Sequence, residues 1–196
     1  MIGIFGGTFN PIHLGHLIAA QQVLDAGGCE NIIFVPCKIH PFGKNISVSG
    51  THRLEMVKLA IKGYKEMSAS DIELASRKVS FTYDTFLKFR KKMPGKKFAI
   101  IIGQDNLMQL KNWKNVEQLG KEAKIIIVPL PAEKAPSKKE LAMHAGKKAV
   151  FLGNCIKTNI SSTHIRQEFR SRGKGNPLLY LPSEVYAYAK KHGLYD

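Results

Sequence analysis

The stretch GGTFNPIHLGH, residues 6–16, decides how this 196-residue chain folds. It follows the apolar run 1–5, which predicts a short buried strand, and precedes residues 17–24, whose apolar spacing predicts a helix packed on a sheet. Glycines let backbone N–H groups approach an anion closely, and a helix start supplies unpaired N–H groups with a positive dipole end. His13 and His16, three residues apart, are expected on one side of that first turn. The stretch therefore predicts a phosphate-binding site between a strand and a helix.

Each part of this stretch also has a purely structural explanation. Two glycines after a strand are common in α/β turns, and one histidine near a helix start often caps the helix or lies on the surface. The combination at this spacing is what favours phosphate chemistry.

Composition excludes several classes of protein. A chain of 196 residues suits one well-buried domain, so we expect a single domain over residues 1–196. No apolar run approaches the roughly 18 residues of a membrane span, and the N-terminus predicts a strand rather than a signal peptide. Cys29, Cys37 and Cys155 are too few and too far apart for a disulfide framework or a zinc cluster. They predict free thiols and a cytoplasmic protein.

The net charge of +15 is the one unusual bulk property. It allows nucleic acid, an anionic surface or a polyphosphate substrate as the partner. The basic residues are spread over expected helix ends and loops, such as 88–92 and 170–174, without a zinc finger or an RNA-binding aromatic motif. We expect the charge to aid solubility and to steer nucleotides, with nucleic-acid binding less favoured and no membrane partner.

Apolar, β-branched runs alternate with helical patterns along the chain. The predicted strands are 1–5, 32–35, 67–74, 98–102, 125–128 and 149–152. The predicted helices are 14–26, 52–63, 82–92, 104–110, 113–121, 138–145, 162–171 and 183–192. In the second helix, Leu54, Val57, Lys58 and Ile61 lie near one predicted apolar stripe, and Met56, Leu59 and Ala60 widen it. Because several runs are apolar on both faces, we predict an α/β fold, a Rossmann-like doubly wound parallel sheet with its ligand at the carboxyl ends of the central strands.

A second motif, NISSTHIR, occupies residues 159–166. Ser161 or Ser162 can cap a helix that starts here, but capping explains only one of three consecutive hydroxyls. Arg166 falls one turn after Ser162, and its guanidinium offers forked, charge-assisted hydrogen bonds that suit phosphate oxygens. Two such helix starts facing one crevice would hold a triphosphate from both ends.

Both motifs resemble those of the bacterial nicotinate mononucleotide adenylyltransferases, in the nucleotidyltransferase superfamily. Residues 6–16 match the histidine signature of that family, except that Asn10 stands where most members carry aspartate. The motif Ile-Ser-Ser-Thr-x-x-Arg is complete at 160–166. Other segments that resemble the family are 52–56, 80–85, 102–105 followed by Trp113, and 181–195.

The resemblance implies adenylyl transfer from ATP to nicotinate mononucleotide, giving deamido-NAD and pyrophosphate in NAD biosynthesis. It implies that Mg²⁺ arrives with ATP, held by phosphates and water, because the sequence shows no carboxylate cluster and no metal ligands. The implied ATP-binding residues are Gly7, Thr8, Phe9, His13, Gly15, His16, Gly103, Asp105, Ile160, Ser162, Thr163 and Arg166. The implied catalytic residues among them are His13, His16 and Arg166.

The mononucleotide side of the resemblance is less complete. The implied mononucleotide-binding residues are Lys44, Thr82, Thr85 and Trp113. Residues 40–44 read HPFGK where the family usually has Pro-Pro-His-Lys, and 129–131 read PLP where members tend to carry an arginine. Instead of binding a nucleotide, Trp113 could anchor the core, and Asp105 could cap a helix.

Three other functions remain open at this point. The first is adenylyl transfer to nicotinamide mononucleotide or another phosphorylated acceptor, or the reaction of another enzyme of the superfamily. Phosphopantetheine adenylyltransferases and cytidylyltransferases are such enzymes, but they generally lack the segment seen at 103–113. The second is a relative of class I aminoacyl-tRNA synthetases, but the chain lacks their Lys-Met-Ser-Lys-Ser motif. The third is a nucleic-acid-binding protein, which would show steep salt dependence and release no pyrophosphate. The sequence also leaves the oligomeric state open, including a homo-oligomer.

Overall fold

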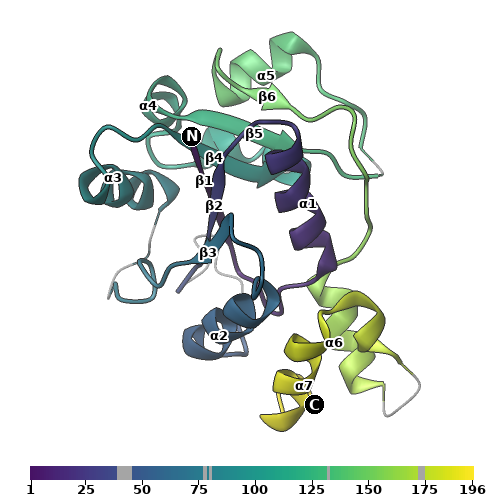
Figure 1. The fold of residues 1–196 in the computed structure, drawn as a ribbon. Helices are drawn as coiled ribbons and strands as arrows, with labels where there is room; N and C mark the ends of the chain where they lie inside the picture. The colour runs from purple at the N-terminus through teal and green to yellow at the C-terminus, as the bar shows by residue number, and fades with distance from the viewer. Residues whose placement is uncertain (39–45, 77–78, 80, 132, 172–174) are drawn as a thin grey trace.

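The computed structural model describes residues 1–38, 46–76, 79, 81–131, 133–171 and 175–196. These residues form one sheet of parallel strands in the order β3-β2-β1-β4-β5-β6 (Figure 1). The strands are β1 (Ile2–Gly7), β2 (Asn31–Pro36), β3 (Met67–Ala69), β4 (Phe98–Gly103), β5 (Lys124–Val128) and β6 (Val150–Phe151). In this order the winding reverses between β1 and β4, where a doubly wound sheet opens a crevice for its ligand. The predicted fold class is confirmed.

Helices cover both faces of the sheet. The α-helices are α1 (Leu14–Asp25), α2 (Gly50–Ala60), α3 (Thr82–Lys92), α4 (Val116–Glu122), α5 (Lys138–Ala145), α6 (Ser162–Arg170) and α7 (Ser183–Lys191). Short 3₁₀ turns are η1 (Gln104–Asn106), η2 (Leu110–Asn112) and η3 (Pro177–Tyr180). Figure 1 shows α3 and α4 on one side of the sheet and α1 on the other, with α2, α6 and α7 grouped at one end.

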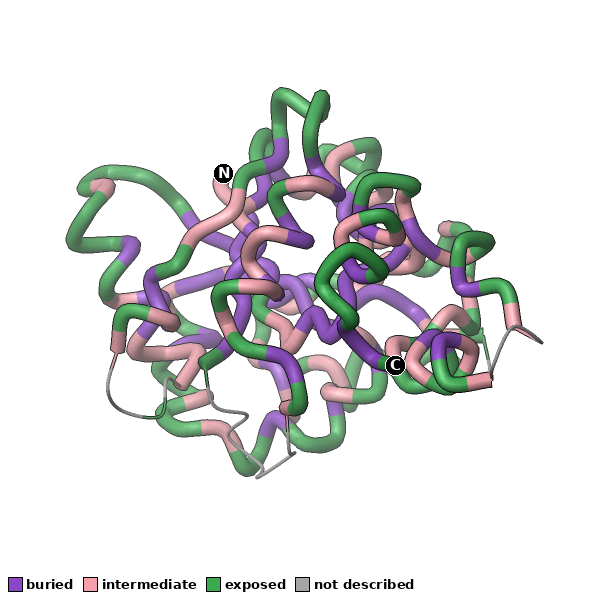
Figure 2. The backbone as a smooth tube through the Cα atoms, turned by 90° about the horizontal axis from the view of Figure 1, so that it is seen from below, coloured by how far each residue is buried: buried purple, intermediate pink, exposed green. Residues whose placement is uncertain are grey.

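Alternate residues of each strand enter two separate apolar cores. In β4, Ala99 and Ile101 pack in the core that α1, α2, α6 and α7 share, whereas Ile100 and Ile102 pack against α3 and α4. This alternation follows from the two-residue repeat of a strand. Because the strands are covered on both faces, the buried residues lie in the middle of the molecule and exposed segments surround them (Figure 2).

Several predicted elements differ from those observed. The predicted strand 67–74 ends at Ala69, and turns follow. The predicted helix 104–110 is replaced by the turns η1 and η2. The helix predicted at 113–121 begins only at Val116, because Asn115 adopts a left-handed conformation with φ of 54°.

The predicted stripe of α2 is confirmed at Met56, Val57, Ala60 and Ile61, which are buried, and is wrong at Lys58, which is exposed. The residues that α2 buries are Arg53, Met56, Val57 and Ala60. Arg53 is only 1% exposed, and its guanidinium donates to the carbonyl oxygens of Thr8 at 2.6 Å, Cys37 at 2.6 Å and Val48 at 3.1 Å. A pattern of apolar residues cannot reveal an arginine whose donors are satisfied by distant carbonyls.

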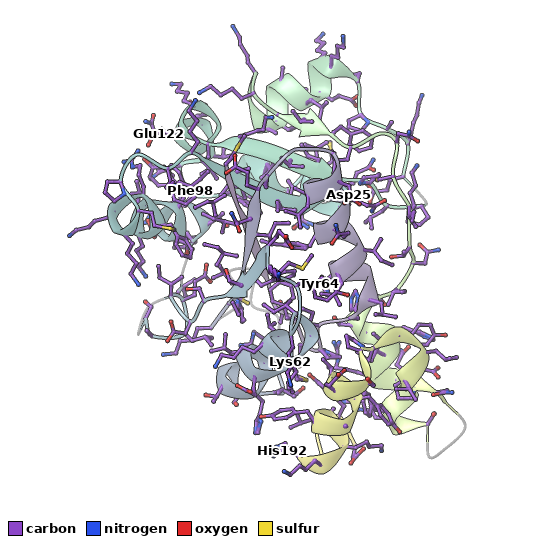
Figure 3. The ribbon with its side chains drawn as sticks, in the orientation of Figure 1. Asp25, Lys62, Tyr64, Phe98, Glu122 and His192 are labelled. Atoms are coloured by element: carbon purple, nitrogen blue, oxygen red, sulfur yellow. The ribbon has the colours of Figure 1, made fainter. Side chains whose placement is uncertain are left out.

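The end of the chain packs against α2. Lys62, which follows α2, and His192, at the end of α7, lie at the same end of the molecule (Figure 3). The Nδ1 atom of His52 on α2 lies 2.9 Å from the hydroxyl oxygen of Tyr188 on α7. None of the described helices is long and apolar enough to cross a membrane.

Candidate active site

A cavity of about 670 Å³ opens at the carboxyl ends of β1 and β4. The winding of the sheet reverses here, so the cavity lies where the fold predicts a ligand. Predicted site residues that line it are Gly7, Thr8, Phe9, His13, Gly15, His16, Thr82, Gly103, Asp105, Trp113, Ile160, Ser162, Thr163 and Arg166. Of the other two, Lys44 lies outside the described residues, and Thr85 is not part of the lining.

The two histidines of the first motif form a stacked pair at the start of α1. Their ring centroids are 3.7 Å apart, and the backbone N–H of His13 donates to Nδ1 of His16 at 3.3 Å. Burial lowers the pKa of His13 to about 4, and burial together with His13 lowers the pKa of His16 well below its usual value. Both imidazoles are therefore neutral at pH 7. Because Nδ1 of His16 accepts a hydrogen bond, we assign its proton to Nε2, which makes that atom a donor.

His13 has a hydrogen-bonding atom that the described protein leaves unpaired. Its side chain is buried, and Nδ1 has no hydrogen-bond partner among the described residues. Buried polar atoms are normally paired, so an orphan atom on a cavity wall points to a ligand. Gly15 lets the chain pass this ring, since a Cβ there would lie 3.1 Å from His13 Nδ1 and 3.0 Å from Thr158 Oγ1.

The second motif joins the first through the start of α6. Ser161 is the N-cap of α6, and its hydroxyl accepts from the backbone N–H of His164. Ser162 donates from Oγ to the carbonyl oxygen of Pro11 at 2.8 Å. Arg166 donates from Nη1 to the carbonyl oxygen of Asn10 at 2.8 Å and from Nη2 to Thr163 Oγ1 at 3.2 Å. The helix starts of α1 and α6 therefore border the same cavity.

The loop between β1 and α1 is held from behind by two further residues. Asn10 is buried, and its Oδ1 accepts from the hydroxyl of Tyr195 at 2.9 Å. The guanidinium of Arg53 binds the carbonyl oxygen of Thr8 in the same loop. The loop is sharply folded, because Phe9 is buried with a left-handed φ of 46°. These contacts fix the backbone N–H groups of Thr8 and Phe9 at the cavity.

The loop after β4 forms the opposite wall. Gly103 allows it to turn tightly, since a Cβ there would lie 2.5 Å from Asp105 Oδ1. Asp105 is exposed at the cavity, and its Oδ1 accepts from the side-chain amide of Asn106 at 2.9 Å. Gln104 is buried, and its amide donates to the carbonyl oxygen of Lys134 at 2.7 Å, which ties the loop after β5 to this wall.

A second part of the cavity lies between α3 and the segment after η2. Thr82, the first residue of α3, and Trp113, at the end of η2, both line it. Lys114 and Asp84 form an ion pair at 3.0 Å that joins the two segments. Trp113 also packs against the core beside α3, which agrees with its alternative role as a core anchor. Its Nε1 is buried and has no hydrogen-bond partner among the described residues.

Thr85 lies behind this wall. It is 1% exposed, and its hydroxyl donates to Oε1 of Glu73 at 2.6 Å. Glu73 is 6% exposed and does line the cavity. Burial raises the pKa of Glu73 to about 7, against the lowering effects of Thr85 and Lys88. No sequence motif marks Glu73, which was not predicted as a site residue.

The described residues offer a metal ion no ligand set of their own. They contain no cluster of three or more His, Cys, Asp or Glu side chains suited to a metal. A divalent cation at this site would therefore depend on ligands from a bound phosphate chain and water.

Comparisons with known proteins agree with this geometry. A family model described as cytidylyltransferase-like matches residues 4–168. A "probable nicotinate-nucleotide adenylyltransferase" of Carboxydothermus hydrogenoformans is 34% identical over 99% of this chain and 97% of its own length. One of the same name from Methylacidiphilum infernorum is 35% identical over 99% of this chain and 91% of its own.

A solved structure shares the fold. It is a nicotinic acid mononucleotide adenylyltransferase of Plasmodium falciparum complexed with NaAD, 22% identical to this chain. The superposition has a TM-score of 0.81 and covers 100% of this chain and 97% of the other.

Proposed function

Because the chain belongs to the cytidylyltransferase-like family and, within it, to the nicotinate-nucleotide adenylyltransferases, we propose that it transfers the adenylyl group of ATP to nicotinate mononucleotide. The products are deamido-NAD and pyrophosphate, and the reaction belongs to NAD biosynthesis. The single observation that carries the proposal is the cavity at the β1–β4 crevice, into which both signature motifs bring their side chains. We further propose one catalytic domain over residues 1–196 and a cytoplasmic location, which the three free cysteines support.

The ATP phosphates fit between the starts of α1 and α6. The backbone N–H groups of Thr8 and Phe9 and the neutral imidazoles of His13 and His16 are donors for the α-phosphate and the bridging oxygen. Arg166 supplies the positive charge for the β- and γ-phosphates. Of the remaining predicted contacts, we assign Ser162 and Thr163 to these phosphates and Asp105 to the ribose.

The chemistry is direct displacement at phosphorus. An oxygen of the acceptor phosphate attacks the α-phosphorus of ATP, and the bond from that phosphorus to the oxygen bridging the β-phosphorus breaks. Pyrophosphate leaves with the electron pair. The attacking phosphate is already ionised, so the step requires no general base; it requires alignment and charge neutralisation, and alignment alone can contribute roughly 7–11 kcal/mol. The substrate is the Mg²⁺ complex of ATP, which suits a site whose described residues form no cluster of metal-binding side chains.

The acceptor ring fits the second part of the cavity. Its phosphate must reach the α-phosphate beside His13 and His16, so its ring extends toward Thr82 and Trp113. Stacking of a ring on an aromatic side chain contributes about 1–3 kcal/mol. Backbone N–H donors and the basic surroundings favour a ring carboxylate over an amide, which would present its own donors to them.

A pyrophosphate-release assay tests the proposed function. We expect release from ATP with nicotinate mononucleotide, a smaller kcat/KM with nicotinamide mononucleotide and none with phosphopantetheine. Equal or greater kcat/KM with the amide would reverse the proposed acceptor preference. No release with either mononucleotide would refute adenylyl transfer to pyridine mononucleotides.

Arg166→Ala is expected to raise the KM for ATP by at least about tenfold, because a forked, charge-assisted contact is lost. Arg166→Lys should restore only part of the affinity, since an ammonium cannot reproduce the fork. Arg170→Ala is the matched control, because Arg170 lies on the same helix, is exposed and does not line the cavity. If Arg166→Ala kept the wild-type KM and kcat, the second motif would only cap helix α6 and would not bind ATP.

A further inference from the structure

Glu73 is a carboxyl group on the wall of the acceptor part of the cavity. It follows β3, is 6% exposed and is bonded at 2.6 Å to Thr85, one turn after the cavity-lining Thr82. The proposed reaction with nicotinate mononucleotide does not use it. If the acceptor ring lies against Thr82 and Trp113 as proposed, this carboxyl group lines the same cavity as the ring carboxylate of nicotinate.

We propose that Glu73 determines the preference between an anionic and a neutral acceptor ring, favouring nicotinate when protonated and penalising it when ionised. This inference rests on the proposed function. Because Glu73 is only 6% exposed, its ionised form would be poorly screened by solvent and would repel the nicotinate carboxylate strongly. A nicotinamide ring carries no charge, and its amide N–H groups can donate to the ionised carboxylate.

The pKa of Glu73 depends on the groups that surround it. On α3, Thr85 donates to it and the exposed Lys88 acts on it through its charge. At the end of β2 it faces the thiol of Cys37, whose pKa burial raises. Across the cavity, Lys114 is occupied by Asp84. Among the described residues no cation forms an ion pair with Glu73.

These surroundings place the change in ionisation near neutral pH. Burial raises the pKa of Glu73 from 4.5 to about 7, so the protonated form dominates below that pH and the ionised form above it. The preference for nicotinate over nicotinamide is therefore greatest on the acid side and declines as the pH rises through 7.

The test is the ratio of kcat/KM for nicotinate mononucleotide to that for nicotinamide mononucleotide, measured from pH 6 to pH 8.5. Titration of ATP, of the catalytic histidines and of the acceptor phosphate affects both substrates and cancels in the ratio. In the wild type the ratio should fall by about tenfold with a midpoint near 7, since kcat/KM reports the free enzyme. In Glu73→Gln, which is neutral and nearly isosteric, the ratio should not change with pH.

Lys88→Met is the matched variant outside the cavity. Removing the cation that lowers the pKa of Glu73 should move the midpoint to higher pH, while the ratio at pH 6 stays as in the wild type. A flat wild-type ratio would overturn the inference, as would a Glu73→Gln variant with the wild-type slope. If Glu73→Gln does not fold, as judged by thermal melting, an unmoved midpoint in Lys88→Met overturns it. Absence of pyrophosphate release with both mononucleotides would instead count against the proposed function.

Discussion

Replacing His16 with alanine is expected to lower kcat by at least about 100-fold with the fold intact, as for one lost transition-state donor. The imidazole is neutral and its Nδ1 accepts the backbone N–H of His13, so Nε2–H is the atom that the substitution removes. Steady-state kinetics with ATP and nicotinate mononucleotide measure the effect. Near-normal turnover in a folded variant would show that His16 only caps α1.

His164→Ala provides the control for this experiment. His164 is an exposed histidine on α6 that does not line the cavity, so its loss should leave kcat unchanged.

The neutral state of His13 and His16 also predicts how kcat depends on pH. The pKa of His13 is about 4 and that of His16 is well below its usual value, so kcat should show no histidine titration between pH 5.5 and 8. An acid limb near pH 6.5 that disappears in His16→Ala would contradict a neutral donor.

Arg53→Met is expected to lower the free energy of unfolding by about 3 kcal/mol. The side-chain volume is largely kept, but the carbonyl oxygens of Thr8, Cys37 and Val48 lose their common donor in the interior. For a chain of this size the expected fall in Tm is about 10 °C. Thermal and denaturant unfolding both measure the change.

Lys58→Met on the same helix is the control, because its ion pair with Glu55 is exposed and contributes little. A Tm for Arg53→Met within about 2 °C of the wild type would mean that water replaces the guanidinium as donor. Since Arg53 also fixes the loop that carries Thr8, we expect kcat to fall in parallel with stability.

The sequence predicted the sheet well because its signals are local. Strands buried on both faces are continuous apolar runs, and the bounds of α3 and α5 were predicted to the residue. Prediction from the sequence failed where a single residue or a distant contact determines the local structure. Because Asn115 has a left-handed conformation, α4 begins later than predicted. Helix α2 buries Arg53, which a pattern of apolar residues does not predict.

The same distinction holds for the site. Residues in contiguous motifs, such as those of 6–16 and 160–166, could be predicted to lie together, and the structure brings both motifs to one cavity. Glu73 and Tyr195 were missed, because each acts through a partner that only the folded chain brings near. Tyr195 bonds to Asn10, and Glu73 bonds to Thr85 across a turn and a helix start. Thr85, predicted as a mononucleotide contact from resemblance, contacts that carboxyl group in the structure.

The bond between Tyr195 and Asn10 bears on when the enzyme becomes competent during its synthesis. The loop that holds Thr8, Phe9 and Asn10 is translated well before the hydroxyl that fixes it, which comes from 185 residues further along the chain. Strands β1 to β6 have all emerged before α7 is made, so the sheet precedes the completed loop. A nascent chain that still lacks α7 and Tyr195 therefore carries both signature motifs while the loop from Thr8 to Asn10 lacks this bond, so the loop is completed only after the sheet.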